Sequence, residues 1–398
     1  GDSLEMQSRV ILTAAFLAGA AATAAYGQQN ALTCQMAGAP LQMRVEARTE
    51  LAGDMTVSCT GGTPGTPLQT NATLTLNRNI TNLSANNQIT QTLLFIDSGG
   101  GFQPSAAIAS LTGPNSVTFG GINATLSATG QAVLKITGIR VDVATSADPV
   151  TAFLSFNGAS SLSLNTNMAT VGRPLAGLLT SGAPGQVNCI LSVFPDAMTM
   201  QAAAEKGTVV FTARATEGFE TAFLRKQAGE LTGTRLLLRY QGFPRGTRLA
   251  VPDLIAGSSA QSQTSPGALG VPASRGAYAP SAAGSLLLVR VLGTDAFGAG
   301  GYPVLPAGAA PAFGTLRDVE LSQTGSGIAV YEVLDSSNLL RESAQFPTYL
   351  ELTELPANTP AVGSYKITLG PIAPAGAVVT SIPSFADVTP SNDCTTLG

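Results

Sequence analysis

The sequence predicts an all-β protein built as two tandem antiparallel β-sandwich domains behind an N-terminal signal peptide. Short segments of alternating apolar and polar residues recur along the 398-residue chain, separated by Gly, Asn, Pro and Ser. Helical periodicity is nearly lacking beyond the N-terminal leader. Hydrophobic residues make up 44% of the chain, which is enough to fill a sizeable core in each of two domains.

Residues 1–27 have the features of a secretory signal peptide. Arg9 supplies the positive charge, the uncharged run Val10–Ala22 follows it, and Ala22–Gly27 holds small residues at cleavage-site spacing. The run is shorter than the roughly 20 residues of a membrane-spanning helix. A buried helix of the pilin type is the alternative reading. We expect a cleaved leader, a mature chain that starts near Gln28 without a membrane span, and an extracellular or cell-surface location.

The strand-like segments fall into two groups, expected to form an N-terminal domain (28–183) and a C-terminal domain (184–398). The first group is Gln42–Arg48, Asp54–Cys59, Ala72–Leu76, Thr92–Ile96, Ser116–Phe119, Ala132–Ile136, Ile139–Val143, Ala152–Phe156 and Ser161–Leu164. The second is Gln186–Val193, Thr208–Arg214, Thr234–Tyr240, Arg248–Val251, Leu286–Leu292, Arg317–Ser322, Ile328–Val333, Tyr349–Glu354 and Tyr365–Leu369. Many short strands spaced by turns are typical of immunoglobulin-like sandwiches.

Three other kinds of segment interrupt this pattern. Ser181–Gln186 contains Gly and Pro and marks the expected domain boundary. Residues 256–284 and 293–314 are rich in Gly, Ala and Pro and predict long loops. Glu217–Gly229 is the best candidate for a helix, because Phe219 and Phe223 would share one face and Gly229 could cap it. The stretch Met198–Glu205 is a weaker helix candidate.

A short internal similarity links the two halves of the chain. The segments Val45–Glu50 and Phe211–Glu217 both carry Arg and Glu among apolar residues, and each comes after a cysteine, Cys34 or Cys189. The match is equally consistent with a duplicated sandwich and with coincidence.

The four cysteines, Cys34, Cys59, Cys189 and Cys394, favour disulfides over a metal site. Their number is even, their spacing is wide, and there is no Cys-x-x-Cys pair. We expect the pairs Cys34–Cys59 and Cys189–Cys394. The pairing Cys34–Cys189, which would bracket the first domain, stays open as the alternative.

Composition excludes several classes of function. The chain has no His, which rules out Ser-His-Asp and Cys-His catalysis and removes the commonest metal ligand. A net charge of −4 without a basic run argues against nucleic-acid binding. No residue pattern identifies a catalytic carboxylate pair, although Glu351 with Glu354, or Asp142 with Asp148, are candidates. We therefore predict no enzyme activity, no cofactor and no bound metal; loop calcium at Asp97 or Asp142–Asp148 is a minor alternative.

The cluster Arg44, Glu46, Arg48 and Glu50 stands out in a chain with only 11% charged residues. On a single strand all four would alternate with Val45, Ala47 and Thr49 and so share one face. Such a charge ladder predicts a solvated strand face or a partner-binding contact face.

The stretch Thr49–Gly65, TELAGDMTVSCTGGTPG, resembles a motif of a group of exported, largely uncharacterised bacterial proteins. Those proteins are similar to one another in a TELxGDxxxxCTGGTP-type motif, and the resemblance continues through most of the mature chain. It implies a β-rich extracellular protein and no particular activity.

Low charge is the strongest functional signal. The chain has only four Lys residues, so its surface must consist largely of Thr, Ser, Asn, Gln, Gly and Ala. Such a surface can pack against copies of itself with little desolvation of charge. The sequence predicts an exported structural subunit that self-assembles into a filament, tube or surface layer. The alternative is a monomeric adhesin that binds surface glycans through Tyr278, Phe297 and Tyr302.

Overall fold

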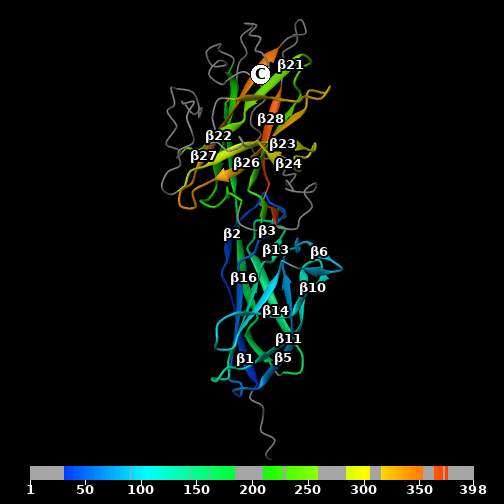
Figure 1. Cartoon of the computed structure of the whole chain (residues 1–398), viewed down its shortest axis with the longest axis vertical. Coiled ribbons are helices and arrows are strands. Elements are labelled where there is room, and N and C mark those ends of the chain that lie inside the picture. Colours follow the sequence, from blue (N-terminus) through cyan, green and yellow to red (C-terminus); the bar gives the residue numbers. More distant parts are fainter. Residues whose placement is uncertain are drawn as a thin grey trace, which may run out of the picture.

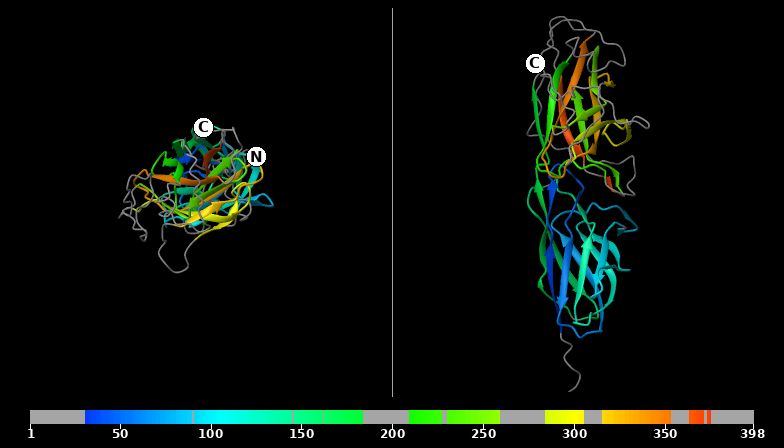
Figure 2. Two further views of the ribbon diagram at one scale, coloured as in Figure 1. Left: turned by 90° about the horizontal axis from the view of Figure 1, so that it is seen from above. Right: turned by 60° about the vertical axis from the view of Figure 1, so that its left-hand side comes forward.

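A computed structural model describes residues 31–89, 91–144, 146–160, 162–183, 209–226, 230–258, 284–304, 315–352, 363–370 and 373–374. The described residues form strands and no helix, arranged as two β-sandwiches stacked end to end along the long axis (Figures 1 and 2). This confirms the predicted all-β fold class. In this part of the chain no helix has the length and apolar character needed to cross a bilayer. The leader lies outside the described residues.

The N-terminal sandwich packs a six-stranded sheet against an eight-stranded sheet. The first contains β15 (Leu162–Thr166), β1 (Leu32–Gly38), β4 (Met55–Thr60), β12 (Ala132–Thr137), β8 (Leu93–Asp97) and β9 (Gln103–Pro104), in that order. The second contains β2 (Leu41–Arg44), β16 (Met168–Leu175), β14 (Val150–Asn157), β5 (Pro67–Leu76), β11 (Ser116–Thr125), β10 (Ile108–Gly113), β7 (Gln88–Ile89) and β6 (Ser84–Ala85). A further pair, β3 (Glu50–Leu51) with β13 (Arg140–Val141), lies outside both sheets.

The strand order is that of an immunoglobulin-like sandwich. The run β1-β4-β12-β8 corresponds to strands A-B-E-D, and β16-β14-β5 corresponds to G-F-C. The chain changes sheets between β1 and β2, and each of these strands pairs in parallel with a late strand, β15 or β16. The hairpin of β10 and β11 extends the second sheet beyond strand C.

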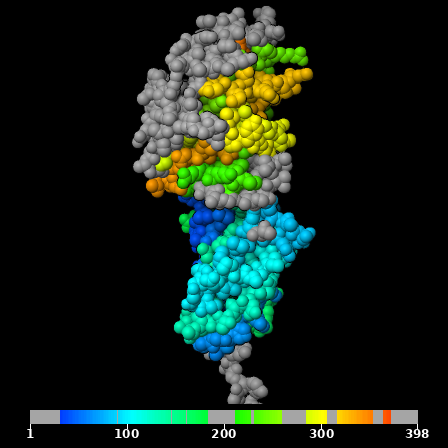
Figure 3. Space-filling view, viewed as in Figure 1, coloured from blue at the N-terminus to red at the C-terminus, as the bar shows by residue number. Residues whose placement is uncertain are grey.

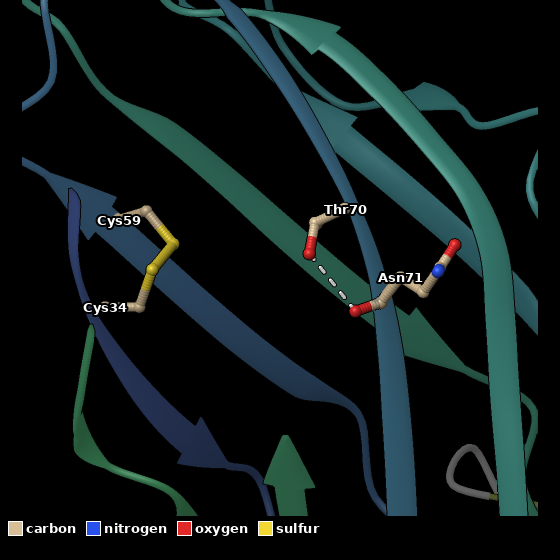
Figure 4. Close-up of a disulfide and its surroundings, with 4 residues drawn as sticks. All are labelled: Cys34, Cys59, Thr70 and Asn71. Carbon is tan, nitrogen blue, oxygen red and sulfur yellow. Dashed lines mark hydrogen bonds between the residues drawn. A yellow bond between two sulfur atoms is a disulfide. The ribbon is translucent and has the colours of Figure 1, made fainter. Parts of the chain in front are cut away.

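Period-two alternation produces the core of this sandwich. In β5, Leu68, Leu74 and Leu76 point inward and are buried. Every second residue along the strand faces outward. A disulfide joins Cys34 on β1 to Cys59 on the neighbouring strand β4, where the two residues are register partners (Figure 4). The predicted pair Cys34–Cys59 is thus confirmed, which excludes Cys34–Cys189. Cys189 and Cys394 lie outside the described residues.

The C-terminal sandwich has a five-stranded and a six-stranded sheet, with a small extra pair. The first contains β17 (Leu178–Ala183), β18 (Val209–Glu217), β27 (Ser343–Leu352), β21 (Thr247–Pro252) and β25 (Leu316–Val319), in that order. The second contains β22 (Leu254–Ala256), β23 (Leu287–Thr294), β26 (Gly327–Asp335), β20 (Arg235–Gln241) and β28 (Ser364–Gly370), with β24 (Gly300–Pro303) added to β23. The extra pair is β19 (Glu230–Thr232) with β29 (Ala373–Pro374).

The two sandwiches repeat one topology. The order β17-β18-β27-β21 matches β1-β4-β12-β8, and β28-β20-β26-β23 matches β14-β5-β11-β10. The similar segments Val45–Glu50 and Phe211–Glu217 are not equivalent in this repeat. The first connects β2 to β3 in its sandwich, whereas the second lies in β18. The repeated strand order therefore supports a duplicated architecture, and the short sequence match does not.

Aromatic rings fill the core between the two sheets of the C-terminal sandwich, and a buried ion pair lies on the other face of its six-stranded sheet. Phe211 stacks on Phe243 and lies 4.9 Å from Tyr365, measured between ring centroids. Arg235 and Glu332 face each other across β20 and β26 at 2.9 Å, and both are buried. Removing either charge would leave the other buried in a low-dielectric environment without a partner. Replacing one member alone is therefore more destabilising than replacing both.

Two expectations about the second domain are wrong. The chain enters the C-terminal sheets at Leu178, since β17 pairs with β18, so the boundary falls at Ala176–Gly177 and not at 183/184. The expected helix at Glu217–Gly229 does not form in its described part. After β18 the chain makes a turn in which the Ala222 amide donates to the Phe219 carbonyl. The turn buries Phe219 and Phe223, so their spacing reflects burial in a turn.

Other expectations fall outside the described residues. These are the strand Gln186–Val193, the weak helix Met198–Glu205, most of the loop 256–284 and the second half of the loop 293–314.

Candidate functional site

Four adjacent strands of the eight-stranded sheet present a broad outer surface without charge, whereas the neighbouring strand β16 carries the exposed Arg173. Strands β14, β5, β11 and β10 contain no Asp, Glu, Lys or Arg, and every residue of the four is described. We call this surface the uncharged face. Its outward residues are Thr151, Phe153, Ser155, Asn157, Gln69, Asn71, Thr73, Thr75, Ser116, Thr118, Gly120, Ile108, Ser110 and Thr112.

Strand register arranges these side chains in rows across the sheet. One row runs from Ser155 through Thr73 and Thr118 to Ser110, each directly opposite the next. The hydroxyls of Thr73 and Thr118 are hydrogen-bonded at 2.9 Å. In the next rows Thr112 donates to Ser116 at 3.1 Å, and the Asn71 amide donates to the Asn157 side-chain oxygen at 2.9 Å. These cross-strand bonds order the polar side chains in the absence of a ligand.

Three apolar side chains rise from or beside this face. Phe153 and Met168 are register partners on β14 and β16 and are 42% and 50% exposed. Ile108, on β10, is 52% exposed and lies opposite Gly120. Phe153 and Met168 are neighbours and form a small apolar projection from a polar surface.

The N-terminal sandwich places its charges elsewhere. The opposite sheet carries the ion pair between Lys135 and Asp54, 2.8 Å apart, and also Asp97. A second group of charges gathers at the junction with the C-terminal sandwich, where the two bodies are in contact (Figure 3).

Arg44 is the central residue of that junction. Its guanidinium binds the Glu50 carboxylate at 2.7 Å, and both side chains are buried. The same group donates across the junction to the Ala222 carbonyl at 3.1 Å and to the Thr234 hydroxyl at 2.9 Å. Arg44 therefore links a strand of the first sandwich to a turn and a strand start of the second.

Glu46 holds the link between the sandwiches. Only Ala176 and Gly177 separate β16 from β17, and the Glu46 carboxylate accepts hydrogen bonds from the Gly177 amide, at 2.9 Å, and from the Leu178 amide. Burial raises the pKa of Glu46, and these amides oppose the shift. A Cβ on Gly177 would lie 2.4 Å from the Arg44 Cγ, so the link needs glycine here.

The predicted contact face is thus an intramolecular junction. The chain turns after Arg44, where the Ala47 amide donates to the Arg44 carbonyl, and this breaks the alternation that a single strand would give. Arg44 and Glu50 are buried, Glu46 is half-buried, and only Arg48 is exposed. The expectation of one solvated or partner-binding face is wrong for three of the four residues.

The motif at Thr49–Gly65 has structural roles in this chain. Glu50 pairs with Arg44, and Cys59 forms the disulfide. A Cβ on Gly53 would lie 1.8 Å from the Ala39 carbonyl oxygen, and one on Gly62 would lie 2.3 Å from Leu126. The motif marks close packing and covalent closure in this chain.

Two buried carboxylates, Glu217 and Glu342, are the nearest approach to a catalytic pair. Glu217 accepts hydrogen bonds from the amides of Phe223 and Glu342, at 2.8 and 2.9 Å. Glu342 accepts from the amides of Leu286 and Ser337, at 2.8 and 3.1 Å. Both side chains are buried, so their geometry is that of groups that hold loops together.

Glu217 should make stability depend on pH. Burial, with smaller contributions from Glu342 and Glu220, raises the pKa of Glu217 to about 8, and the backbone hydrogen bonds oppose this. Its ordinary value is 4.5, so the folded state holds a proton that the unfolded chain has lost. The stabilising contribution of Glu217 is then fully present below pH 4.5 and is lost as pH rises to about 8, at up to about 1.4 kcal/mol per pH unit.

Urea unfolding at intervals from pH 5 to 9 measures this effect. In Glu217→Gln the free energy of unfolding should fall much less steeply with pH, whatever the absolute stability of the variant. Glu46 should account for the pH dependence that remains. Glu320→Gln is the control, because Glu320 is exposed and is not among the groups that shift the pKa of Glu217, so this variant should keep the slope. An unchanged slope in Glu217→Gln would contradict the assignment.

The remaining sequence candidates are not brought together. Asp97 accepts hydrogen bonds from the Gly99 and Gly101 amides, and Asp142 accepts one from the Ala144 amide, as in ordinary loop turns. Glu354 lies outside the described residues. Among the residues that are described, no group of three or more Cys, Asp or Glu is placed to hold a metal ion.

A hairpin of the C-terminal sandwich presents two aromatic rings. Phe297 and Tyr302, at the tip and on β24, are 72% and 64% exposed. The Asp295 carboxylate accepts hydrogen bonds from the Phe297 and Ala299 amides, both at 2.9 Å, and so fixes the tip. Tyr278, the third aromatic residue proposed from the sequence, lies outside the described residues.

The fold places this chain in the class of tandem β-sandwich proteins. A disulfide joins two strands of the N-terminal sandwich, and such bonds form in exported proteins. No family model and no curated protein matches the chain. Among solved structures, the C-terminal domain of the Streptococcus agalactiae AgI/II polypeptide BspA is 7% identical, with 85% of this chain and 95% of that chain covered and a TM-score of 0.30. The corresponding domain of the Streptococcus pyogenes antigen I/II-family protein AspA is 8% identical, with 87% and 96% covered and a TM-score of 0.28.

A third likeness is to BslA, described as a bacterial hydrophobin, at 14% identity, with 37% of this chain and 98% of that chain covered and a TM-score of 0.20. Scores of this size do not establish a common fold. The fold class of this chain rests on its own strands and sheets.

Proposed function

We propose that this protein is an exported structural subunit that assembles with copies of itself at the cell surface, without catalysing a reaction. The observation that carries the proposal is the uncharged face, four adjacent strands wide. Exposed sheets usually carry charges that keep neighbouring molecules apart. A face made of hydroxyl, amide and apolar groups lacks that protection.

The junction supports the same proposal. A two-residue link, the Glu46 contacts to it, and the Arg44 contacts to Ala222 and Thr234 connect the sandwiches at several points. Arg140 and Glu230 add an ion pair at 3.9 Å across the same junction. A subunit whose two bodies are held at a fixed angle can transmit a regular geometry from copy to copy.

Sedimentation velocity of the exported protein over a wide concentration range, followed by electron microscopy, tests the proposal. We expect the sedimentation coefficient to rise with concentration and ordered polymers to appear at the highest concentrations. A single monomeric species throughout, with no polymer in the micrographs, would refute it. The signal-peptide leader is tested separately by N-terminal sequencing of the exported chain, which should begin near Gln28.

Adhesion to neutral surface glycans is the second candidate. The exposed rings of Phe297 and Tyr302 on one ordered hairpin favour it, because aromatic rings offer flat apolar surface at low entropic cost. A glycan array should then show binders that Phe297→Ala and Tyr302→Ala each weaken. Leu339→Ala, which truncates an equally exposed apolar residue elsewhere in this sandwich, is the control and should bind like the wild type.

A further inference from the structure

We infer that two copies of this chain associate face to face through the uncharged face, with the row from Ser155 to Ser110 at the centre of the contact. The inference rests on the proposed function, since it names the surface and the partner. A second copy is the occupant because every group on this face is compatible with its own duplicate.

Hydrogen-bonding chemistry is the first reason. Hydroxyl and amide side chains both donate and accept, so a surface built from Thr, Ser and Asn can bond to an identical surface. A face of carboxylates or amines could not, because like groups would repel across the contact. No charge on β14, β5, β11 or β10 opposes the approach of a second copy.

The shape of the uncharged face is the second reason. Phe153 and Met168 rise from one part of it. At Gly120 and Gly121, where β11 bulges, an added Cβ would meet no atom within 4 Å, so this part is open. Each copy thus carries both a protruding and an open region. A twofold axis lying in the contact plane between them would place the Phe153 ring of each copy over the Gly120–Gly121 bulge of the other.

Side-chain order and area set the strength of the contact. The bonds Thr73 to Thr118 and Asn71 to Asn157 already restrict the groups that would meet, which lowers the entropy lost on docking. Four strands about 4.8 Å apart and about eight residues long give a plan area of about 500 Å² per copy. Two faces together bury about 1,000 Å², the lower end of specific interfaces, so a weak dimer is expected.

Charge placed on the central row tests the inference. Ser155→Lys should weaken dimerisation at least tenfold in sedimentation equilibrium, because two like charges would meet across the contact. The matched control is Ser58→Lys, an exposed serine on β4 whose side chain faces outward from the opposite sheet. It should change the dimerisation constant by less than twofold.

A charge-swap experiment makes the partner explicit. Ser155→Glu alone should also weaken association, whereas an equimolar mixture of Ser155→Lys and Ser155→Glu should recover it. Recovery requires that residue 155 of one copy faces residue 155 of another or its near neighbours. Circular dichroism establishes that each variant is folded; if a charged variant is not, crosslinking of Ser155→Cys by a short bismaleimide replaces it, with Ser58→Cys as control.

The outcomes separate the two proposals. If the wild type assembles but Ser155→Lys assembles equally well, or the mixture does not recover, the face is wrong and self-assembly stands. If the wild type is monomeric at all concentrations, both proposals fail. If the uncharged face binds a neutral polysaccharide while the protein stays monomeric, the face is an adhesive surface and the inference of a second copy is overturned.

Discussion

Replacing Arg44 with Met should lower the free energy of unfolding by about 3–5 kcal/mol, because it leaves the buried Glu50 carboxylate without its partner. The Ala222 carbonyl also loses its donor across the junction. Urea unfolding followed by circular dichroism measures the loss. Arg48→Met, four residues along and exposed, is the matched control and should stay within about 0.5 kcal/mol of the wild type.

A double variant separates the two contributions. Arg44→Met with Glu50→Met should recover the part caused by the stranded carboxylate. It should leave about 1–3 kcal/mol for the junction groups that Arg44 no longer satisfies. If Arg44→Met lowered the free energy of unfolding no more than Arg48→Met, the assignment of Arg44 to a buried junction would be wrong.

Removing the Cys34–Cys59 disulfide should destabilise the N-terminal sandwich by about 3.5 kcal/mol in the chain-entropy account, since the bond closes a loop across 25 residues. Both sulfurs are buried, so Cys34→Ala with Cys59→Ala also removes core volume. Reducing agent should destabilise the N-terminal sandwich of the wild type and leave the N-terminal sandwich of the double variant unchanged.

Tyrosine fluorescence makes this test specific to one sandwich. The chain has no Trp, and after Tyr26 its tyrosines all lie at or beyond Tyr240. Fluorescence therefore reports on the C-terminal sandwich, while circular dichroism reports on both. The disulfide variant should shift the dichroism transition to lower urea and leave the fluorescence midpoint nearly in place. Equal shifts in both signals would mean that the disulfide stabilises the two sandwiches as one unit.

Local pattern explains what sequence reasoning predicted correctly. Segments such as Ala132–Ile136 and Ala152–Phe156 were predicted as strands and form β12 and β14, in which buried residues alternate with less buried ones. Strands β10, β16 and β17 were not predicted, because Gly, Ala, Ser and Pro blur their alternation, and β1 was not predicted although its residues alternate. Their place is set by pairing with neighbours, which a single segment does not encode.

The candidate site was missed for a related reason. Its signal is present in the sequence, where residues 55–77, 98–134 and 149–172 contain no charged residue. Those runs become one surface only when β14, β5, β11 and β10 lie side by side. The sequence pattern instead favoured the charged cluster at Arg44–Glu50 as a contact face. The role of Arg44 depends on its contact with Thr234, which lies 190 residues away in the sequence.

By itself, the order of residues determined the fold class and the strand-rich halves, because alternation acts over a few neighbouring positions, and it favoured the disulfide Cys34–Cys59 without excluding Cys34–Cys189. Only the tertiary structure decided that a conspicuous charge cluster is buried between two bodies and that the uncharged runs share one surface. The physical reason is that burial and juxtaposition are properties of contacts between distant segments, and these exist only once the sheets have formed.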